Sequence, residues 1–258
     1  MMFKMPAVMA IPADRLLLIR PFYTVGRMVE AASWLGRISH VVNKELVFAP
    51  NVPTLIRNGA TCVKRMRPAE SQVYDLVQVV TPFDDLERQH VADVLEWIQS
   101  GANIYRIEKP DKPPKHLVSY FVLIDPDHNS LLLADHVKAQ LWLPSGGHVE
   151  PEEDPKDTVV REAQEELGQP AVFLRNNDKP VFVTVTQTVG LTAGHTDVSL
   201  WYLLRGSIHD HVTFDRREFN DIAWFTFKEI LESSPVIFDP HMQRFTQKLI
   251  TWLQPQKT

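Results

Sequence analysis

Several stretches of the chain contain almost only apolar side chains, and these stretches predict buried strands. The clearest is Leu117–Ile124, in which Ser119 is the one small polar residue. Turn-forming residues follow at Asp125–Asn129, and a second apolar run occupies Ser130–Asp135, so the two runs predict a hairpin. Later apolar runs predict three more strands, at Pro180–Val189, Thr196–Leu204 and Ile222–Thr226.

Between these runs, apolar residues recur at helical spacing. In residues 81–100, Thr81 can cap a helix, Pro82 suits its first turn and Gly101 can end it. The apolar stripe of this helix consists of Leu86, Val91, Val94, Leu95 and Ile98. The same spacing predicts helices at about 155–167, Phe227–Ser233 and Pro240–Leu253. Strands alternating with helices indicate an α/β fold.

Residues 1–80 carry weaker patterns and no recognisable chemical motif. Met28–Leu35 predicts a short helix, and Leu46–Phe48 and Leu76–Val80 predict short strands. Lys109–Lys115 has three prolines in seven residues, which predicts a stiff, extended linker. We therefore divide the chain into an N-terminal extension with linker, 1–114, and a domain with a C-terminal helix, 115–258. Residues 1–80 are expected to be dispensable for any chemical step.

Negative charge is concentrated in one short window. Eight acidic and two basic residues lie between Glu150 and Glu166, a net charge of −6, whereas the whole chain carries −5. Carboxylates this close repel one another unless a cation lies among them, and oxygen ligands suit Mg²⁺ or Mn²⁺. The window therefore indicates a metal site; the alternative is a glutamate-rich helix that merely faces solvent.

Helical phase supports the metal interpretation, because residues three and four apart share a helix face. One face of the helix predicted at 155–167 carries Glu162, Glu165 and Glu166. Another face can pack inward and carries Val160, Ala163 and Leu167.

The ends of this helix also have suitable residues. Asp154 can cap it, Pro155 fits its first turn, and Gly168 can end it in the left-handed conformation. Just upstream, Ser145–Gly147 predicts a flexible loop whose backbone can approach a ligand closely.

The segment from Gly147 to Gly168 resembles the Nudix box. That pattern is a glycine, five residues, a glutamate, seven residues, and then Arg-Glu-U-x-Glu-Glu-x-Gly-U, where U is a bulky aliphatic residue. Its fixed positions are occupied here by Gly147, Glu153, Arg161, Glu162, Glu165, Glu166 and Gly168. Two positions depart from it: Ala163 is small and Gln169 is polar, which weakens packing around the helix but removes no metal ligand.

The resemblance implies a Nudix α/β/α sandwich with a mixed sheet, here with an N-terminal extension that contains the helix at about 81–100. It also implies a hydrolase that uses Mg²⁺, with Mn²⁺ as the alternative cation. Glu165, Glu166 and the backbone carbonyl of Gly147 are the implied metal ligands. Glu162 would bind a second metal or accept a proton from water.

The remaining box residues and their neighbours have supporting roles in this prediction. Arg161 belongs to the site, where with Glu153 it is expected to orient the helix and the loop. Gly146, Gly147 and His148 are candidates for contact with substrate. His195 is a further candidate, as a phosphate contact or a base, with an ordinary surface histidine as the alternative.

Many Nudix proteins supply a further carboxylate from outside the box. The candidates here are Glu218 and Asp221, each as a metal ligand and Glu218 also as a catalytic base; a solvated loop is the alternative. Glu218 is preferred because its side chain reaches further. Arg216 and Arg217 precede them and are further candidates for phosphate contacts.

The resemblance predicts hydrolysis of a phosphoanhydride bond in a nucleoside diphosphate linked to another group. Nucleoside triphosphates are the leading substrates; nucleotide sugars, ADP-ribose and dinucleoside polyphosphates stay open. A second class of function is a non-catalytic nucleotide sensor or regulator, which eroded box acids would favour. Isopentenyl diphosphate isomerase chemistry needs an active-site cysteine, and the one cysteine, Cys62, lies outside the predicted core.

Composition narrows the partners. The net charge of −5 provides no general attraction to nucleic-acid backbones, so no nucleic acid is expected as a partner. A single cysteine precludes an internal disulfide and a cysteine-rich zinc site. No apolar run approaches the ~20 residues of a membrane span. We expect a cytoplasmic protein that binds a small nucleotide; the helix at 81–100 packs on the core or in a homodimer.

Overall fold

Strand β1 (Lys115–Asp125) is the centre of the sheet and is buried along almost its whole length. It runs parallel to β6 (Thr196–Arg205) and antiparallel to β4 (Ser145–His148). Its last residues pair with β2 (Ser130–His136). The computed structural model describes residues 66–109 and 111–255. A strand that is covered on both faces needs apolar residues at successive positions, which explains the uninterrupted apolar sequence of β1.

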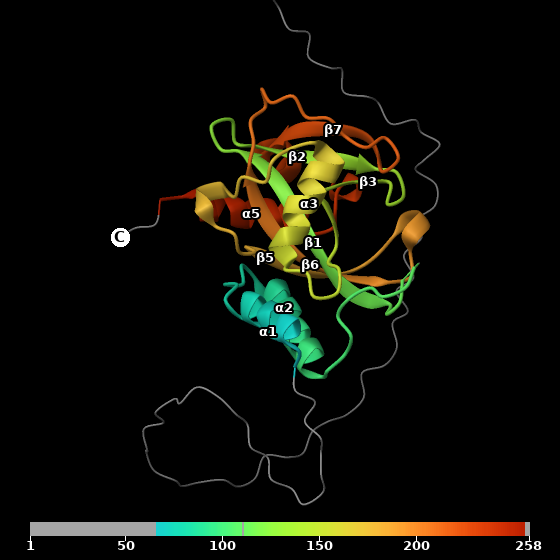
Figure 1. The fold of residues 1–258 in the computed structure, drawn as a ribbon. Coiled ribbons are helices and arrows are strands. Elements are labelled where there is room, and N and C mark those ends of the chain that lie inside the picture. Colours follow the sequence, from blue (N-terminus) through green and yellow to red (C-terminus); the bar gives the residue numbers. More distant parts are fainter. Residues whose placement is uncertain (1–65, 110, 256–258) are drawn as a thin grey trace, which may run out of the picture. The chain divides into compact units, whose positions relative to one another are not determined.

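The sheet has a mixed part and an antiparallel part, joined where β1 meets β2 (Figure 1). In the mixed part, β5 (Phe182–Gln187) pairs antiparallel with β6. In the antiparallel part, β2 lies between β3 (Leu141–Leu143) and β7 (Phe219–Thr226). The predicted hairpin is therefore present only close to its turn, because β1 and β2 then diverge and pair with other strands.

Helices cover both faces of the sheet. Leu117 and Phe121 of β1 point into one apolar core, whereas Val122 and Ile124 point into the other, as expected for alternating strand residues. The first core is covered by α1 (Pro68–Gln78), α2 (Asp85–Gln99) and α3 (Pro155–Leu167). The second core is covered by α4 (Phe227–Glu232) and α5 (Met242–Leu253). This is the predicted α/β/α sandwich with a mixed sheet.

Three short 3-10 helices complete the described elements: η2 (Leu174–Asn176), η3 (Gly190–Thr192) and η4 (Pro235–Ile237). No helix in residues 66–109 and 111–255 is long and apolar enough to cross a membrane.

The structure corrects two predictions for the N-terminal helices. Leu76–Val80 is not a strand, because Leu76 lies in α1, where Val73 and Val77 point into the core at helical spacing. The next helix, α2, does not begin at Thr81. Its cap is Asp84, whose carboxylate accepts a hydrogen bond of 2.8 Å from the Glu87 backbone N–H. An aspartate satisfies the first turn as well as a threonine does, so sequence could not distinguish them.

The predicted linker at Lys109–Lys115 is not uniformly extended. Glu108 pairs with Lys112 in an isolated antiparallel bridge, and Lys115 is already the first residue of β1. The domain boundary placed after residue 114 stays a prediction. The helix and strands predicted at 28–35 and 46–48 lie outside the described residues.

The segment predicted as a flexible loop, Ser145–Gly147, is part of strand β4. Gly147 pairs with Ser119 and Gly146 with Tyr120 in the ladder to β1. A Cβ atom at Gly146, where φ is +150°, would fall on the Ser119 carbonyl oxygen, so the close pairing requires glycine. The two glycines that suggested flexibility instead allow a strand to lie against β1.

Candidate active site

Helix α3 has the predicted bounds. The Asp154 carboxylate accepts a hydrogen bond of 3.0 Å from the Lys156 backbone N–H, and Gly168 ends the helix with φ of +60°. Ala163 and Leu167 pack into the core as expected. Val160 does not, because its side chain is 46% exposed and Val159 takes the buried position instead.

The two glycines of β4 lie against two glutamates of α3. The backbone N–H of Gly146 donates a hydrogen bond of 3.0 Å to Glu166 Oε2. A Cβ atom at Gly147 would fall on the carboxylate of Glu162. Glycine is therefore required at this position for the helix to bring Glu162 and Glu166 against the strand.

Glu166 is the most perturbed carboxyl group of this site. Burial, and after it the neighbouring carboxylates of Glu162 and Glu218, raise the pKa of Glu166 to about 9. Burial also raises the pKa of Glu162. Glu218 lies close enough to hydrogen-bond with the Glu166 carboxyl group, although it comes from the segment that precedes β7.

These three carboxyl groups suit a divalent cation. They come from two distant parts of the chain, and burial together with the charges of Glu162 and Glu218 holds a proton on Glu166 well above neutral pH. A cation among them would replace that proton, and an all-oxygen donor set is the one that Mg²⁺ prefers. The oxygen atoms of these three carboxyl groups therefore fit a site for a hard divalent cation such as Mg²⁺.

Arg161 links the glutamates of the box. Its Nε lies 3.1 Å from Glu153 Oε1 and its Nη1 lies 2.5 Å from Glu162 Oε1. Its Nη2 also donates to the carbonyl oxygen of His148, at 3.4 Å. The hydrogen bond with Glu153 is the main reason why the pKa of Arg161 is raised. The predicted ion pair with Glu153 is thus present, and it joins α3 to the segment before it.

Two predicted ligands lie less centrally. The Glu165 side chain is 61% exposed, and its Oε2 lies 3.7 Å from Arg161 Nη1. Asp221 lies within β7, opposite Asp135, and its Oδ1 accepts a hydrogen bond from the Ile222 backbone N–H. Their roles as metal ligands stay predictions.

The two histidines predicted as substrate contacts lie in one cluster. His148 Nε2 is 3.0 Å from Nε2 of His116, a residue for which the sequence suggested no role. His195 Nε2 and His116 Nε2 each lie 3.3 Å from Asp197 Oδ1. Burial lowers the pKa of His148 to about 3, so this imidazole is neutral. His195 is buried, contrary to the surface alternative.

The two arginines before Glu218 lie on the exposed side of their segment. Arg217 pairs with Asp215, with its Nη2 2.5 Å from Asp215 Oδ2. The guanidinium carbon of Arg216 lies 5.2 Å from the centre of the Phe214 ring. Among the described residues, neither arginine forms a hydrogen bond or ion pair with Glu162, Glu166 or Glu218, although the hydrogen bond with Asp215 and, after it, the charge of Glu218 raise the pKa of Arg217.

A comparison with protein families decides the identity of this fold and site. The model for the NUDIX domain matches residues 114–249, more than half of the chain. The chain belongs to the NUDIX family. It is accordingly a Nudix-type hydrolase, and the glutamates of α3 lie in its Nudix box. No curated protein matches the chain.

Solved structures similar to this Nudix chain include three from different organisms. A NUDIX family hydrolase from Clostridium perfringens is 18% identical, with 54% of this chain and 98% of that chain covered and a TM-score of 0.45. A MutT protein from Methanosarcina mazei Go1 is 18% identical, with 55% and 97% covered and a TM-score of 0.42. The NUDIX domain of Shewanella oneidensis NrtR, complexed with ADP ribose, is 14% identical, with 54% and 88% covered and a TM-score of 0.43.

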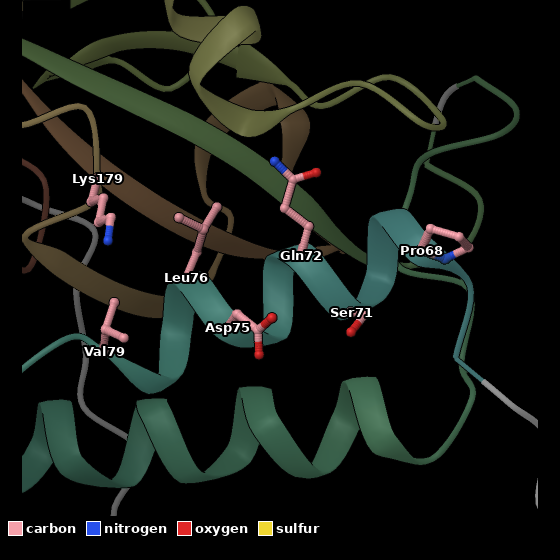
Figure 2. Close-up of a pocket in the computed structure, with 7 residues that line it drawn as sticks. All are labelled: Pro68, Ser71, Gln72, Asp75, Leu76, Val79 and Lys179. Carbon is pink, nitrogen blue, oxygen red and sulfur yellow. The ribbon is translucent and has the colours of Figure 1, made fainter.

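A hollow in the surface lies along α1 (Figure 2). One of its lining residues, Gln72, donates a hydrogen bond of 2.6 Å to Asp154, the cap of α3. It is lined by Pro68, Ser71, Gln72, Asp75, Leu76, Val79 and Lys179. None of these residues is a candidate for catalysis or metal binding, and most belong to one exposed side of α1. We therefore assign no ligand to this hollow.

Sequence reasoning missed His116 and Asp111 as possible members of a site. His116 begins the apolar run of β1, and Asp111 lies among the prolines that suggested a linker. Only the parallel pairing of β1 with β6 reveals that His116 lies opposite Asp197. A histidine at the end of a buried strand was the one signal that could have drawn attention to it.

Proposed function

We propose that this Nudix-type hydrolase cleaves a phosphoanhydride bond in a nucleoside diphosphate linked to another group, using Mg²⁺. The observation that carries the proposal is the convergence of Glu162, Glu166 and Glu218 beside the two glycines of β4. Mn²⁺ also prefers oxygen ligands and is the alternative cation.

Glu162 and Glu166 are the proposed core of the metal site, with the backbone carbonyl of Gly147 as a further ligand. A divalent cation held there would neutralise phosphate charge and make a bound water more acidic and nucleophilic. The hydrogen bond from Gly146 keeps the Glu166 carboxylate in place, and Arg161 does the same for Glu162. Both groups are thus oriented before substrate arrives.

Glu218 is the proposed proton acceptor for the attacking water. It is exposed, so that substrate and water can reach it, and it lies beside the buried carboxyl group of Glu166. Glu162 is less suited to accept the proton, because Arg161 already occupies one of its oxygens. Glu165 and Asp221 are proposed as outer metal contacts.

Nucleoside triphosphates are the leading substrate class in this proposal. Nucleotide sugars, ADP-ribose and dinucleoside polyphosphates contain the same reacting diphosphate, and the box residues contact only that part. Gly146 is the proposed contact with the rest of the substrate. The rings of His148 and His195 pack against His116 and are assigned no substrate contact in this proposal. The similar solved structures include both a MutT protein and a domain complexed with ADP ribose, so they do not favour one class.

A substrate panel tests the proposal. Purified full-length protein is incubated with Mg²⁺ and nucleoside triphosphates, nucleotide sugars, ADP-ribose or dinucleoside polyphosphates, and the products are identified by mass. We expect cleavage within the diphosphate of at least one class and loss of that cleavage in excess chelator. Turnover that persists in excess chelator would refute the metal site, and nucleotide binding without turnover would indicate a sensor.

A further inference from the structure

We propose that Asp111, His116, His148 and His195 form a second metal site, for a cation of the zinc class. Each of these residues offers one ligand atom, and the four atoms all lie within 4.8 Å of one another. The site is distinct from the glutamate cluster in its ligand atoms, and the proposal does not rest on the hydrolytic reaction.

The cluster is built by strand pairing. His116 on β1 lies directly opposite Asp197 on β6 in the parallel ladder. His195 precedes Asp197 by two residues, just before β6 begins, so the backbone can direct both side chains to the same side of the sheet. On the other side of β1, His148 at the end of β4 pairs with Val118. Three strand ends thus bring three imidazoles together.

The rings are packed as one group. The ring centres of His116 and His195 are 5.0 Å apart with an angle of 22° between the planes. Those of His116 and His148 are 4.7 Å apart. His116 is completely buried and His195 is 6% exposed, whereas solvated histidines on a sheet edge would not need to stack in this way.

Hydrogen bonding fixes the orientation of the central ring. Nδ1 of His116 lies 2.8 Å from the Pro113 carbonyl oxygen, which can only accept, so this nitrogen carries the proton. In the neutral ring, Nε2 then presents a lone pair. A backbone carbonyl that binds one ring nitrogen and leaves the other free is the arrangement found behind metal-bound histidines.

The free nitrogen of His116 faces other electron-rich atoms. It lies 3.0 Å from His148 Nε2 and 3.3 Å from Asp197 Oδ1. Asp197 Oδ1 is buried, and the ring nitrogens nearest to it, Nε2 of His116 and Nε2 of His195, are each 3.3 Å away. One proton between the two imidazoles satisfies only one of these contacts, whereas a cation would satisfy several lone pairs at once.

The charges around the cluster favour a cation. Asp111 Oδ2 lies 3.4 Å from His195 Nδ1, and Asp197 adds a second carboxylate beside the rings. Arg106 opposes them, because its positive charge acts on both His148 and His195. Two negative charges against one positive charge leave the cluster net negative when its imidazoles are neutral.

Ligand chemistry indicates which cation. Imidazole nitrogen suits zinc and similar transition metals, whereas Mg²⁺ prefers oxygen. Zinc binds nitrogen at about 2.0–2.1 Å in tetrahedral sites, which places ligand atoms roughly 3.3 Å apart. The more distant of the four atoms must therefore move closer, and Nε2 of His116 and Nε2 of His148, which are 3.0 Å apart, must separate slightly. The bound metal would tie the segment containing Asp111 to the ends of β1, β4 and β6, and would fix His148 directly after Gly147.

The test uses full-length protein that has been freed of metal and kept in excess Mg²⁺, so that the glutamate cluster is occupied. Zinc is then titrated in competition with a zinc-binding dye, and the amount of bound metal is measured by elemental analysis. We expect one equivalent of zinc per chain and a rise in melting temperature. Cobalt in its place should show the intense visible absorption of a tetrahedral site.

Matched variants locate the bound metal. His148→Gln and His195→Gln should each weaken zinc binding by at least ~10-fold, since each removes one nitrogen ligand. His209→Gln, at an exposed histidine outside the cluster, and Glu166→Gln should leave zinc binding unchanged. If a histidine variant does not fold by circular dichroism, Asp111→Asn supplies the test from a half-buried position.

The proposal is overturned if the unmodified protein binds no equivalent of zinc at micromolar concentration. It is also overturned if folded variants at His148, His195 and Asp111 all retain the affinity of the unmodified protein. Loss of zinc binding in Glu166→Gln would place the ion in the glutamate cluster instead, which equally refutes a second site.

Discussion

The Gly146 backbone N–H donates a hydrogen bond of 3.0 Å to the Glu166 carboxylate across the contact between β4 and α3. This bond connects the residue just before the Nudix box to a glutamate near its end, twenty residues further along the sequence. It favours the charged form of Glu166, whereas burial and two neighbouring carboxylates favour the protonated form. The position of Glu166 is therefore determined by the backbone, and its charge depends on the metal.

Glu166→Gln should lower turnover by at least ~100-fold, because the amide keeps the shape but cannot supply the negative charge that holds a divalent cation. Turnover at saturating Mg²⁺ is the measurement, with circular dichroism to confirm the fold. The melting temperature without metal should not fall, since the substitution removes a carboxyl group that is buried beside two other carboxyl groups, those of Glu162 and Glu218. Near-normal turnover would show that Glu166 does not bind the metal.

Glu218→Ala should reduce turnover by about 10- to 1000-fold, as expected for loss of a positioned base or metal ligand. Asp221→Ala should have a smaller effect, because Asp221 lies on β7 with its carboxylate bonded to the adjacent backbone. Both residues are exposed, so neither change should alter the melting temperature much. If both single variants and the double variant keep the turnover of the unmodified protein, the box acids or His195 must serve as the base or metal ligand.

Asp84→Asn should destabilise the protein at neutral pH but much less in acid. Asn can still cap α2, yet it cannot pair with Arg244, whose Nε lies 2.7 Å from Asp84 Oδ2. The hydrogen bond with Arg244 lowers the pKa of Asp84 from 3.8 to about 2. A lowered pKa means that the stabilisation is present above pH 3.8 and is lost as the pH falls through about 2.

Urea unfolding of Asp84→Asn and of the unmodified protein, at neutral pH and at several acidic pH values, measures this dependence. Asp85→Asn is the matched control, since Asp85 lies beside the cap and pairs with exposed Arg88. A stability difference that stays constant down to the lowest pH would contradict the ion-pair explanation.

A truncated chain that begins at Thr81 should be less stable than one that begins at residue 66. The shorter chain lacks α1, whose Val73 and Val77 are completely buried in the core shared with α3. Each buried valine contributes roughly 1.5–3 kcal/mol by the transfer of its side chain from water. The melting temperatures of the two truncated chains test this.

The chemical step should survive in the chain that begins at residue 66, in agreement with the prediction that residues 1–80 contain no catalytic group. Turnover per folded molecule is the relevant quantity. A folded but inactive chain from residue 66 would show that the segment before it contributes to the site.

Local sequence was sufficient to predict the box helix and the strongest strands. The cap at Asp154, the proline at the first turn and the glycine at 168 all act within a few residues, so their effects do not depend on the rest of the fold. The apolar run of β1 likewise required burial on both faces, whatever its partners. The acidic window and its helical spacing predicted a metal site, and the family was predicted from the resemblance of the segment Gly147 to Gly168 to the Nudix box.

Other features depended on contacts between distant residues, which no local pattern specifies. Thr81 and Asp84 are both suitable caps, and the ion pair of Asp84 with Arg244, 160 residues away, accompanies the one that is used. Val159, rather than Val160, is buried because helix rotation depends on what α3 packs against. The glycines of β4 suggested a loop until the contact with Ser119 and Glu162 showed why side chains are excluded.

By itself, the sequence determined the elements with strong local signals, the class of the fold and the chemical type of the Nudix box. The tertiary structure decided which carboxylates converge and placed Glu218 beside Glu166 while leaving Glu165 exposed. It also brought His116, His148 and His195 together, although they are separated by dozens of residues. The physical reason is that helix and strand periodicity act over a few residues, whereas the pairing of strands sets which side chains meet.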